Sequence, residues 1–400
     1  MKQHKTFVLI DFCARYSFTH HTPLIKVYCD TIIASGSDLL VLLPRYAERT
    51  AFINTKGDKH YILTSSLFGP SFSQSPLWYL INRLVFKLNK DSQKDSRFKE
   101  MIRKAMLFKA IKFIKNFEFN NKKICFVFPT ADPLSIELTK QLSKIAKFKN
   151  SSFNFRIVGA ESRGQLASKR ELKDLVHLAQ FYKLNIRLGY ETPGFKDYLI
   201  KFGFHINQLF WSPWPKLDYS ERNFTNSTEF KIGFLGNAKK RKGFDSIPQI
   251  LDTLKQNKIL FSAKIQLACF QWDTYLSTLE ILKKNFAKSI EFVNCELGLS
   301  DLQNLIKSLD VLILPYDPDS YSINASGLLY HAADYGIPVL ATRKVGFESE
   351  VHDYGIGYIF DDFQDIPQLL QETKKSNLDL NFVKYNLDRS MATNLFLFEK

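Results

Sequence analysis

The chain has 400 residues, 45% of them apolar, which is enough for two or three domains with cores of their own. Its net charge of +15 is uneven, with +18 on residues 1–220 and −3 on residues 221–400. A basic half attracts polyanions such as nucleic acid, an anionic membrane or a phosphorylated acceptor. No motif that reads DNA or RNA accompanies the charge, so we expect no nucleic-acid partner.

The five cysteines are scattered and form no CxxC pair, so neither a zinc site nor a disulfide framework is indicated. No run of eighteen apolar residues occurs, and the first twenty residues lack the apolar core and cleavage site of a signal peptide. We therefore expect a cytoplasmic protein, with a peripheral place at the inner face of the membrane as the alternative.

Through residues 1–215, short apolar segments alternate with helical ones. The expected strands are 6–12, 38–43, 124–128, 153–158 and 185–188. The expected helices are 24–36, 76–90, 97–119, 133–146, 169–182 and 194–202. Residues 44–75 are rich in turn formers and give no clear pattern. Alternation of strands and helices at this length predicts a parallel α/β sheet.

His20 and His21 follow the first expected strand. Ligands of open parallel sheets bind beyond the carboxyl ends of the strands, so these histidines are candidates for an acceptor site. A base, a phosphate partner and a plain loop residue are all compatible with a histidine here.

Residues 81–123 carry a net charge of +9. In their last helical stretch, apolar side chains share one face and three lysines line the other: Met106, Ala110, Phe113, Ile114 and Phe117 against Lys109, Lys112 and Lys115. Two interpretations stay open. The helix covers the sheet and exposes its lysines to solvent, or it contacts an anionic membrane with apolar insertion by Phe113, Ile114 and Phe117.

A polar stretch, residues 216–229, predicts a linker, and the alternation then restarts. The expected strands are 230–235, 264–269, 289–293, 311–314 and 338–341. The expected helices are 244–256, 274–286, 300–308 and one that begins near Ser326. We predict two tandem doubly wound domains, residues 1–215 and 230–375, followed by a helix of undetermined docking within 376–400.

Two loops of the second half carry candidate chemistry. The loop from Gly236 to Gly243 holds Lys239, Lys240, Arg241 and Lys242 between a strand and a helix. Cations beside a helix N-terminus suit a diphosphate, although a short charge run is also typical of a solvated turn. Ser326 and Gly327 begin a helix after another strand, so both loops are expected to flank one crevice.

Asp317, Pro318 and Asp319 spell DxD. Paired carboxylates are suitable ligands for Mn²⁺ or Mg²⁺ that bridges a diphosphate. The same residues are also typical of a polar turn. A metal site and a plain loop are therefore both open here.

The second half resembles the donor domain of two-domain GT-B glycosyltransferases, in particular the family-4-like retaining enzymes. The resemblance lies in FLGNAKKRKGFD, in IEFVNCELGLSDLQNLIKSLDVLILPYDP and in SGLLYHAADYGIPVLAT with GFESEV after it. The first half resembles the acceptor domains in outline only. The resemblance implies two Rossmann-like domains that face a central cleft, a nucleotide-sugar donor and no metal cofactor.

The resemblance also implies roles for individual residues. Lys242 matches the family's diphosphate-binding lysine and, with His21, is implied to be catalytic. Ser326 and Gly327 match a phosphate-binding Ser-Gly, and Cys295 to Leu297 fall where the base is held. The implied donor-binding set is completed by Gly236, Asn237, Lys239, Arg241, Tyr321, His331 and Glu350.

Two departures from the family pattern stand out. Asn237 replaces an arginine, so Lys239, Lys240 or Arg241 would supply the second cation. The family's ExxxxxxxE pair is missing, with Ile323 near its first position and His331 at its second.

We predict a retaining, metal-independent glycosyltransferase of cell-surface polysaccharide or glycoconjugate synthesis. Its acceptor would be a glycan or a lipid-linked glycan, held near His20 and His21. The missing glutamate pair favours one alternative, a non-catalytic two-domain binder of an anionic ligand. The DxD sequence favours another, a metal-dependent glycosyltransferase.

Overall fold

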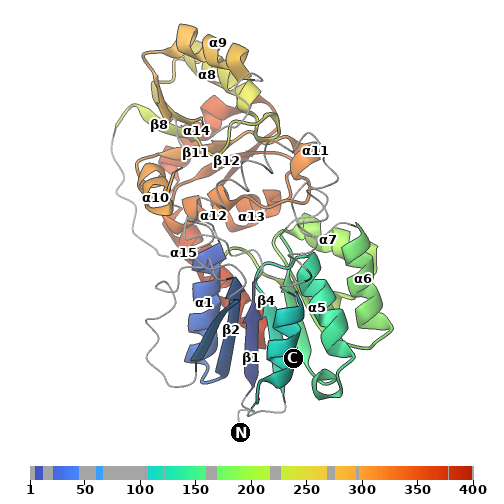
Figure 1. Cartoon of the computed structure of the whole chain (residues 1–400). Coiled ribbons are helices and arrows are strands. Elements are labelled where there is room, and N and C mark those ends of the chain that lie inside the picture. Colours follow the sequence, from blue (N-terminus) through green and yellow to red (C-terminus); the bar gives the residue numbers. More distant parts are fainter. Residues whose placement is uncertain are drawn as a thin grey trace, which may run out of the picture. The chain divides into compact units, whose positions relative to one another are not determined.

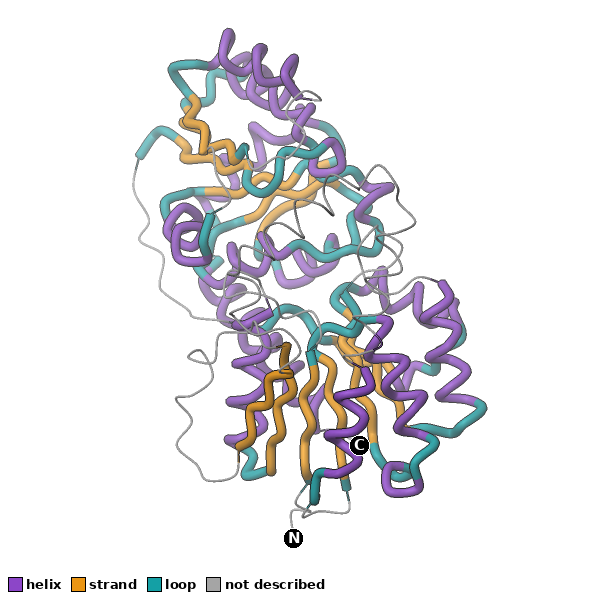
Figure 2. Tube along the Cα trace, viewed as in Figure 1, coloured by secondary structure: helices purple, strands orange, loops and turns teal. Residues whose placement is uncertain are grey.

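The computed structural model describes residues 5–11, 21–44, 60–65, 104, 107–119, 123–158, 169–216, 227–267, 275–293, 297–376 and 378–398 (Figure 1). The chain divides into two compact units. Unit 1 comprises Met1–Tyr190, Ile200–Phe210 and Asn394–Lys400, and unit 2 comprises Glu191–Leu199 and Trp211–Thr393. In each unit a sheet lies between helices (Figure 2).

Unit 1 is built on a seven-stranded sheet of order β3-β2-β1-β4-β5-β6-β7. The strands are β1 (Thr6–Ile10), β2 (Asp38–Pro44), β3 (His60–Ser65), β4 (Ile124–Phe128), β5 (Ser152–Arg156), β6 (Asn185–Tyr190) and β7 (Leu209–Trp211). Every residue of β1 and β4 is buried, because helices cover both faces of a central parallel strand. Its helices include α1 (His21–Ala34), α5 (Pro133–Ser143), α6 (Lys169–Gln180) and α7 (Pro193–Phe202).

Unit 2 is built on a six-stranded sheet of order β10-β9-β8-β11-β12-β13, and all its strand pairs are parallel. The strands are β8 (Phe230–Phe234), β9 (Phe261–Gln266), β10 (Ile290–Val293), β11 (Val311–Leu314), β12 (Val339–Thr342) and β13 (Gly357–Phe360). The chain order reverses between β8 and β11. In doubly wound sheets such a switch point opens the crevice where ligands bind.

Side chains from the two faces of this sheet enter two separate cores. On one face, Ile232 and Ile265 pack with Leu251 of α8 (Ile247–Gln256) and Leu282 of α9 (Leu276–Phe286). On the other, strand residues such as Leu312 and Leu314 pack with α10 (Leu299–Lys307) and α12 (Gly327–Asp334). The remaining α-helices of this half are α11 (Pro318–Tyr321), α13 (Glu348–Tyr354), α14 (Ile366–Lys375) and α15 (Asp379–Phe398).

The predicted architecture of two tandem doubly wound parallel sheets is confirmed, with differences at single elements. β9 begins at Phe261, three residues before the expected strand, and β3, β7, β13, α13 and α14 were not predicted. The unit boundaries also differ from the expected ones. Glu191–Leu199 belongs to unit 2, and α15 ends in residues that belong to unit 1.

The basic helix of the first half is described for residues 107–116. Ile114 is fully buried, and Phe117 contacts the rings of Phe113 and Phe119 (centroids 5.7 and 4.9 Å apart). The predicted apolar insertion is therefore wrong for Ile114. Phe113 and Phe117 are half-buried and pack against neighbouring aromatic rings of unit 1. Residues 76–90 lie outside the described part of the chain, as does Met106. Among the helices that the structure describes, none combines the length and apolarity needed to cross a membrane.

Candidate functional site

The basic loop after β8 folds tightly against the chain that leaves β11. Residues 240–242 form a 3₁₀ turn that ends at Gly243, whose φ is +71°. A Cβ on Gly243 would lie 1.9 Å from the carbonyl oxygen of Pro315, so only glycine fits there. Asp317 donates its backbone N–H to the carbonyl oxygen of Arg241 (3.0 Å), which ties the two loops together.

The ammonium group of Lys242 lies beside Gly236. A Cβ on Gly236 would lie 2.7 Å from Lys242 Nζ and 3.4 Å from a methyl carbon of Leu328, in the first turn of α12. The same ammonium lies 5.7 Å from the ring centroid of Tyr316. Burial lowers the pKa of Lys242, and the charge of Arg241 lowers it further. The structure thus brings the basic loop and the start of α12 together, as the sequence predicts.

A small cavity of about 20 Å³ opens at this point and is lined by Gly236, Asn237, Lys242, Gln266 and Tyr316, among others. The side chain of Gln266, at the end of β9, accepts the backbone N–H of Gly236 (2.7 Å). The cavity therefore lies beyond the carboxyl ends of β8, β9 and β11, where a doubly wound sheet places its ligand.

The first turn of α12 is open to a ligand. Ser326 is the N-cap residue, but its side chain makes no capping hydrogen bond and lies 3.3 Å from the hydroxyl of Tyr316. Among the described residues outside this helix turn, no atom lies within 4 Å of the place that a Cβ on Gly327 would take. Free N–H groups at a helix start attract anions, so this turn can accept a phosphate.

Two tyrosines and Arg241 complete this group of residues. The rings of Tyr316 and Tyr321 lie 4.4 Å apart, and the guanidinium carbon of Arg241 lies 5.9 Å from the ring centroid of Tyr321. Burial raises the pKa of Tyr316 to about 12 and raises that of Tyr321 as well, so both are neutral donors. Of the three candidates for the second cation, Arg241 is half-buried in this group, while Lys240 is exposed.

The DxD sequence forms a helical turn. Asp317 is the N-cap residue of α11, and its carboxylate accepts the hydroxyl of Ser320 (2.5 Å). Asp319 is exposed. Across the described ranges, no three His, Cys, Asp or Glu side chains gather into a group that could hold a metal ion.

Three residues that the sequence analysis did not single out fix the loop after β11. A Cβ on Gly346 would lie 2.8 Å from the backbone of Ile323, and one on Gly194 would lie 2.6 Å from the carbonyl oxygen of Ser322. The hydroxyl of Thr192 donates to the carbonyl oxygen of Ile323 (2.9 Å). Of these three residues, only the two glycines could have been noticed from the sequence. The hydrogen bond of Thr192 joins residues that are far apart in the chain, so it leaves no local sequence pattern.

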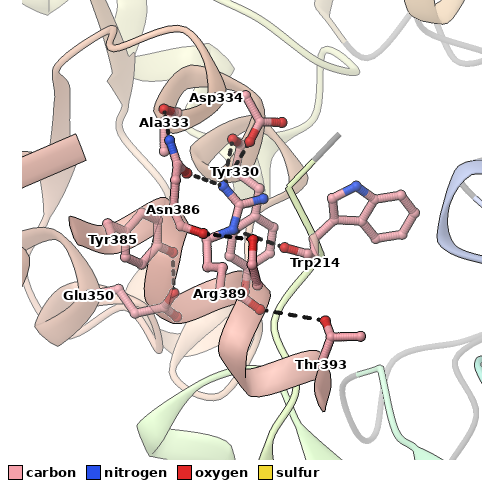
Figure 3. Close-up of polar contacts among 10 residues, drawn as sticks. Trp214, Tyr330, Ala333, Asp334, Glu350, Tyr385, Asn386, Arg389 and Thr393 are labelled. Atoms are coloured by element: carbon pink, nitrogen blue, oxygen red, sulfur yellow. Dashed lines mark hydrogen bonds and ion pairs between the residues drawn. The ribbon is translucent and has the colours of Figure 1, made fainter. Parts of the chain in front are cut away.

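Glu350 lies in a buried network around α15 (Figure 3). Its carboxylate accepts a hydrogen bond from the hydroxyl of Tyr385. Close by, the fully buried Arg389 donates to Asp334 Oδ1 (2.9 Å) and to the carbonyl oxygen of Trp214 (2.9 Å). Burial raises the pKa of Glu350 to about 8, although Tyr385 and Arg389 oppose the shift and Glu191 adds to it. Glu350 was predicted to bind the donor. In the structure its carboxylate is hydrogen-bonded to Tyr385 of α15.

Four of the other predicted site residues lie in the described part of the chain, and three lie wholly or partly outside it. His331 is buried on α12, with 2% of its surface exposed. Lys239, Asn237 and Leu297 are each half-buried. His20 and Cys295 lie outside the described residues, and of His21 only the backbone is described, at the start of α1.

No family model matches the sequence, and no curated protein matches it either. Solved structures do match the fold. HepE from Anabaena, in complex with UDP and glucose, is 13% identical over 98% of this chain and 95% of its own, with a TM-score of 0.56. Sucrose-phosphate synthase from Thermosynechococcus elongatus is 12% identical over 98% of this chain and 95% of its own, with a TM-score of 0.60.

A third protein of similar fold is the N-terminal domain of trehalose-6-phosphate phosphatase from Candida albicans. It is 10% identical over 98% of this chain and 96% of its own, with a TM-score of 0.59. At these identities the likeness establishes the fold, two Rossmann-like parallel-sheet domains of the GT-B class, and the activity has to be argued from the site.

Proposed function

We propose that this protein is a glycosyltransferase that takes its sugar from a nucleotide-sugar bound to unit 2. The observation that carries the proposal is the meeting of the Lys242 ammonium, Gly236 and the open first turn of α12 at the carboxyl ends of β8 and β11. A cation and free helix N–H groups at one point are what a diphosphate requires. HepE was solved with UDP and glucose, which makes UDP-sugars the first donors to test.

In the proposed reaction the protein stabilises the nucleoside diphosphate as it leaves. Lys242 and Arg241 would meet the charge that develops on the diphosphate, with the N–H groups of Gly327 and Leu328 on its other side. Preorganised electrostatic stabilisation of this kind is often the largest catalytic contribution. A bound metal would not be required. A retaining outcome and a glycan or lipid-linked acceptor, held near His20 and His21, are part of the proposal and rest on the family resemblance.

Calorimetry with UDP tests the donor site directly. Lys242→Ala should weaken UDP binding by about 1.5 to 3 kcal/mol, the value of a charged hydrogen bond, while thermal stability is kept. Arg241→Ala should weaken it too if Arg241 is the second cation. Lys255→Ala, at an exposed position on α8, is the matched control and should bind UDP as the wild type does. Equal UDP affinity in all four proteins would refute the donor site.

The second candidate function, a non-catalytic binder of an anionic ligand, is favoured by Ile323 and His331 in the places of the family's glutamates. His331 is neutral or cationic where a carboxylate is expected. A coupled assay of UDP release from UDP-glucose, with and without glycan acceptors, separates the two functions. A protein that binds UDP but releases none from any UDP-sugar would be a binder.

A further inference from the structure

A second cavity, of about 310 Å³, lies at the amino-terminal ends of β8, β9 and β10 in unit 2, opposite to the strand ends that form the donor site. Its lining includes Lys231, Ser262, Lys264, Lys288, Ser289 and Glu291. A β8 strand of five residues separates it from the loop at Gly236, which corresponds to roughly 15 Å. The residues that line it are therefore distinct from the donor site.

Strand alternation explains why this cavity is polar. Phe230, Ile232 and Ala263 point into the core beneath α8 and α9. Their neighbours on the chain must point to the other face, because side chains alternate along a strand. Lys231 pairs with Ser262 and Lys264 pairs with Glu291 across the parallel ladder, so these side chains stand together on that face.

The charges of the cavity are not balanced internally. Lys264 and Glu291 form one long ion pair, with 3.8 Å between Nζ and the carboxylate oxygen. Among the described residues, Lys231 and Lys288 form no ion pair. Asp310 is near, but its carboxylate accepts the backbone N–H of Lys231 (2.8 Å). Two lysines and the hydroxyls of Ser262 and Ser289 are left to face the cavity.

We propose that this cavity binds a small phosphate monoester. A phosphate dianion would meet two lysines and two hydroxyl donors, which are charge-assisted hydrogen bonds of the strong kind. The volume is at the lower end of the range for small-molecule sites, so it suits a metabolite of roughly ten heavy atoms. Neither a duplex nor a bilayer enters a space of this size.

Amide NMR on the full chain tests the site, because Ala263 and Ile290 line the cavity and their backbone N–H groups report on it. The experiment uses the Lys242→Ala background, so that phosphate binding at the donor loop does not contribute. Inorganic phosphate, glycerol 3-phosphate and neutral glycerol are titrated separately at constant ionic strength. We expect the two phosphates, and not glycerol, to shift both amide signals in a saturable way.

The matched variants decide the outcome. Lys231→Gln with Lys288→Gln should weaken phosphate binding roughly tenfold or more, through the lost charged hydrogen bonds. Lys283→Gln with Lys284→Gln, which makes the same charge change on exposed positions of α9, should not. Glycerol 3-phosphate should bind more tightly than inorganic phosphate if the ligand is a monoester. Equal weakening by both pairs, or no shift of the Ala263 and Ile290 signals, would overturn the proposal. Neither result bears on UDP binding.

Discussion

Gly236 sets the position of the Lys242 ammonium. A methyl group there would lie 2.7 Å from Nζ, and the φ of +99° disfavours any side chain. We therefore expect Gly236→Ala to reduce both stability and UDP affinity. Gly327→Ala is the control for stability, because its methyl group would enter open space at the start of a helix. Thermal melts and UDP calorimetry on both variants check the prediction, which fails if Gly236→Ala binds UDP with wild-type affinity.

Glu350 should couple stability to pH. Its pKa rises from 4.5 to about 8 on folding, so the folded protein holds a proton that the unfolded chain has lost between these values. The free energy of unfolding should therefore fall as pH rises from about 5 to about 8, by up to about 1.4 kcal/mol per pH unit, and level off above that. Urea unfolding across this range measures it.

Glu350→Gln provides the comparison, since an amide keeps the shape and does not titrate. The unfolding free energy of the wild type minus that of Glu350→Gln should fall as pH rises from about 5 to about 8. A difference that is constant across the range would mean that Glu350 is ionised in the folded protein.

The residues of the basic loop could be predicted from sequence, because Gly236, Lys242 and Gly243 lie within eight positions of one another. The partner of Glu350 could not. Tyr385 is 35 residues away, and Arg389 is 55 residues from Asp334. No local pattern reports a contact between such distant positions.

At the scale of elements, the hydrophobic pattern located the fully buried strands, while β7 and β13, which it missed, are partly exposed. β11 matches its expected bounds, and it is buried along its whole length. β13 was missed because three of its four residues are half-buried and it begins with glycine. β3 lies in the turn-rich segment that gave no pattern. Short edge strands depend on pairing with a neighbour, and that information is not local.

We predict that the helix at residues 107–116 contacts anionic membranes through its charge alone. Lys112 and Lys115 are exposed, and each cation near an anionic surface contributes on the order of 1 kcal/mol. We expect the protein to sediment with anionic but not neutral vesicles and to be released by about 0.5 M salt.

Charge reversal at Lys109, Lys112 and Lys115 should reduce sedimentation. Reversal at Lys283 and Lys284 of α9 should not, and UDP binding should persist in both proteins. Equal recovery on neutral and anionic vesicles would contradict this model. The positive charge of this half would then be explained by attraction of a soluble, anionic acceptor.

Removal of metal ions tests whether the DxD sequence at α11 is a metal site or a plain turn. The carboxylate of Asp317 is already engaged by Ser320, so we expect turnover of a UDP-sugar to persist in EDTA and in Asp319→Ala. Asp317→Ala, which removes the hydrogen bond from Ser320, should affect stability more than Asp319→Ala. Strict dependence on Mn²⁺ that is lost in Asp319→Ala would establish the DxD site instead.

At the scale of the whole chain, the core of unit 1 includes residues from both ends of the sequence. Asn154 donates to the carbonyl oxygen of Phe396 (2.8 Å), and the rings of Phe7 and Phe398 meet edge to face at 5.3 Å. We predict that Phe396→Ala destabilises the protein by about 3 to 5 kcal/mol in urea unfolding. Leu395→Ala is the control, because Leu395 is 46% exposed and should change stability by less than about 0.5 kcal/mol. Equal effects would mean that the end of α15 does not contribute to the core.

This packing has a consequence for protein synthesis. A ribosome delivers β1 and β4 early, and amino-terminal domains usually fold as soon as they have emerged. Here Asn154 must await a partner 242 residues further along the chain. Unit 1 therefore cannot complete its core until Phe396 and Phe398 have been translated, after all the strands of unit 2 have been made.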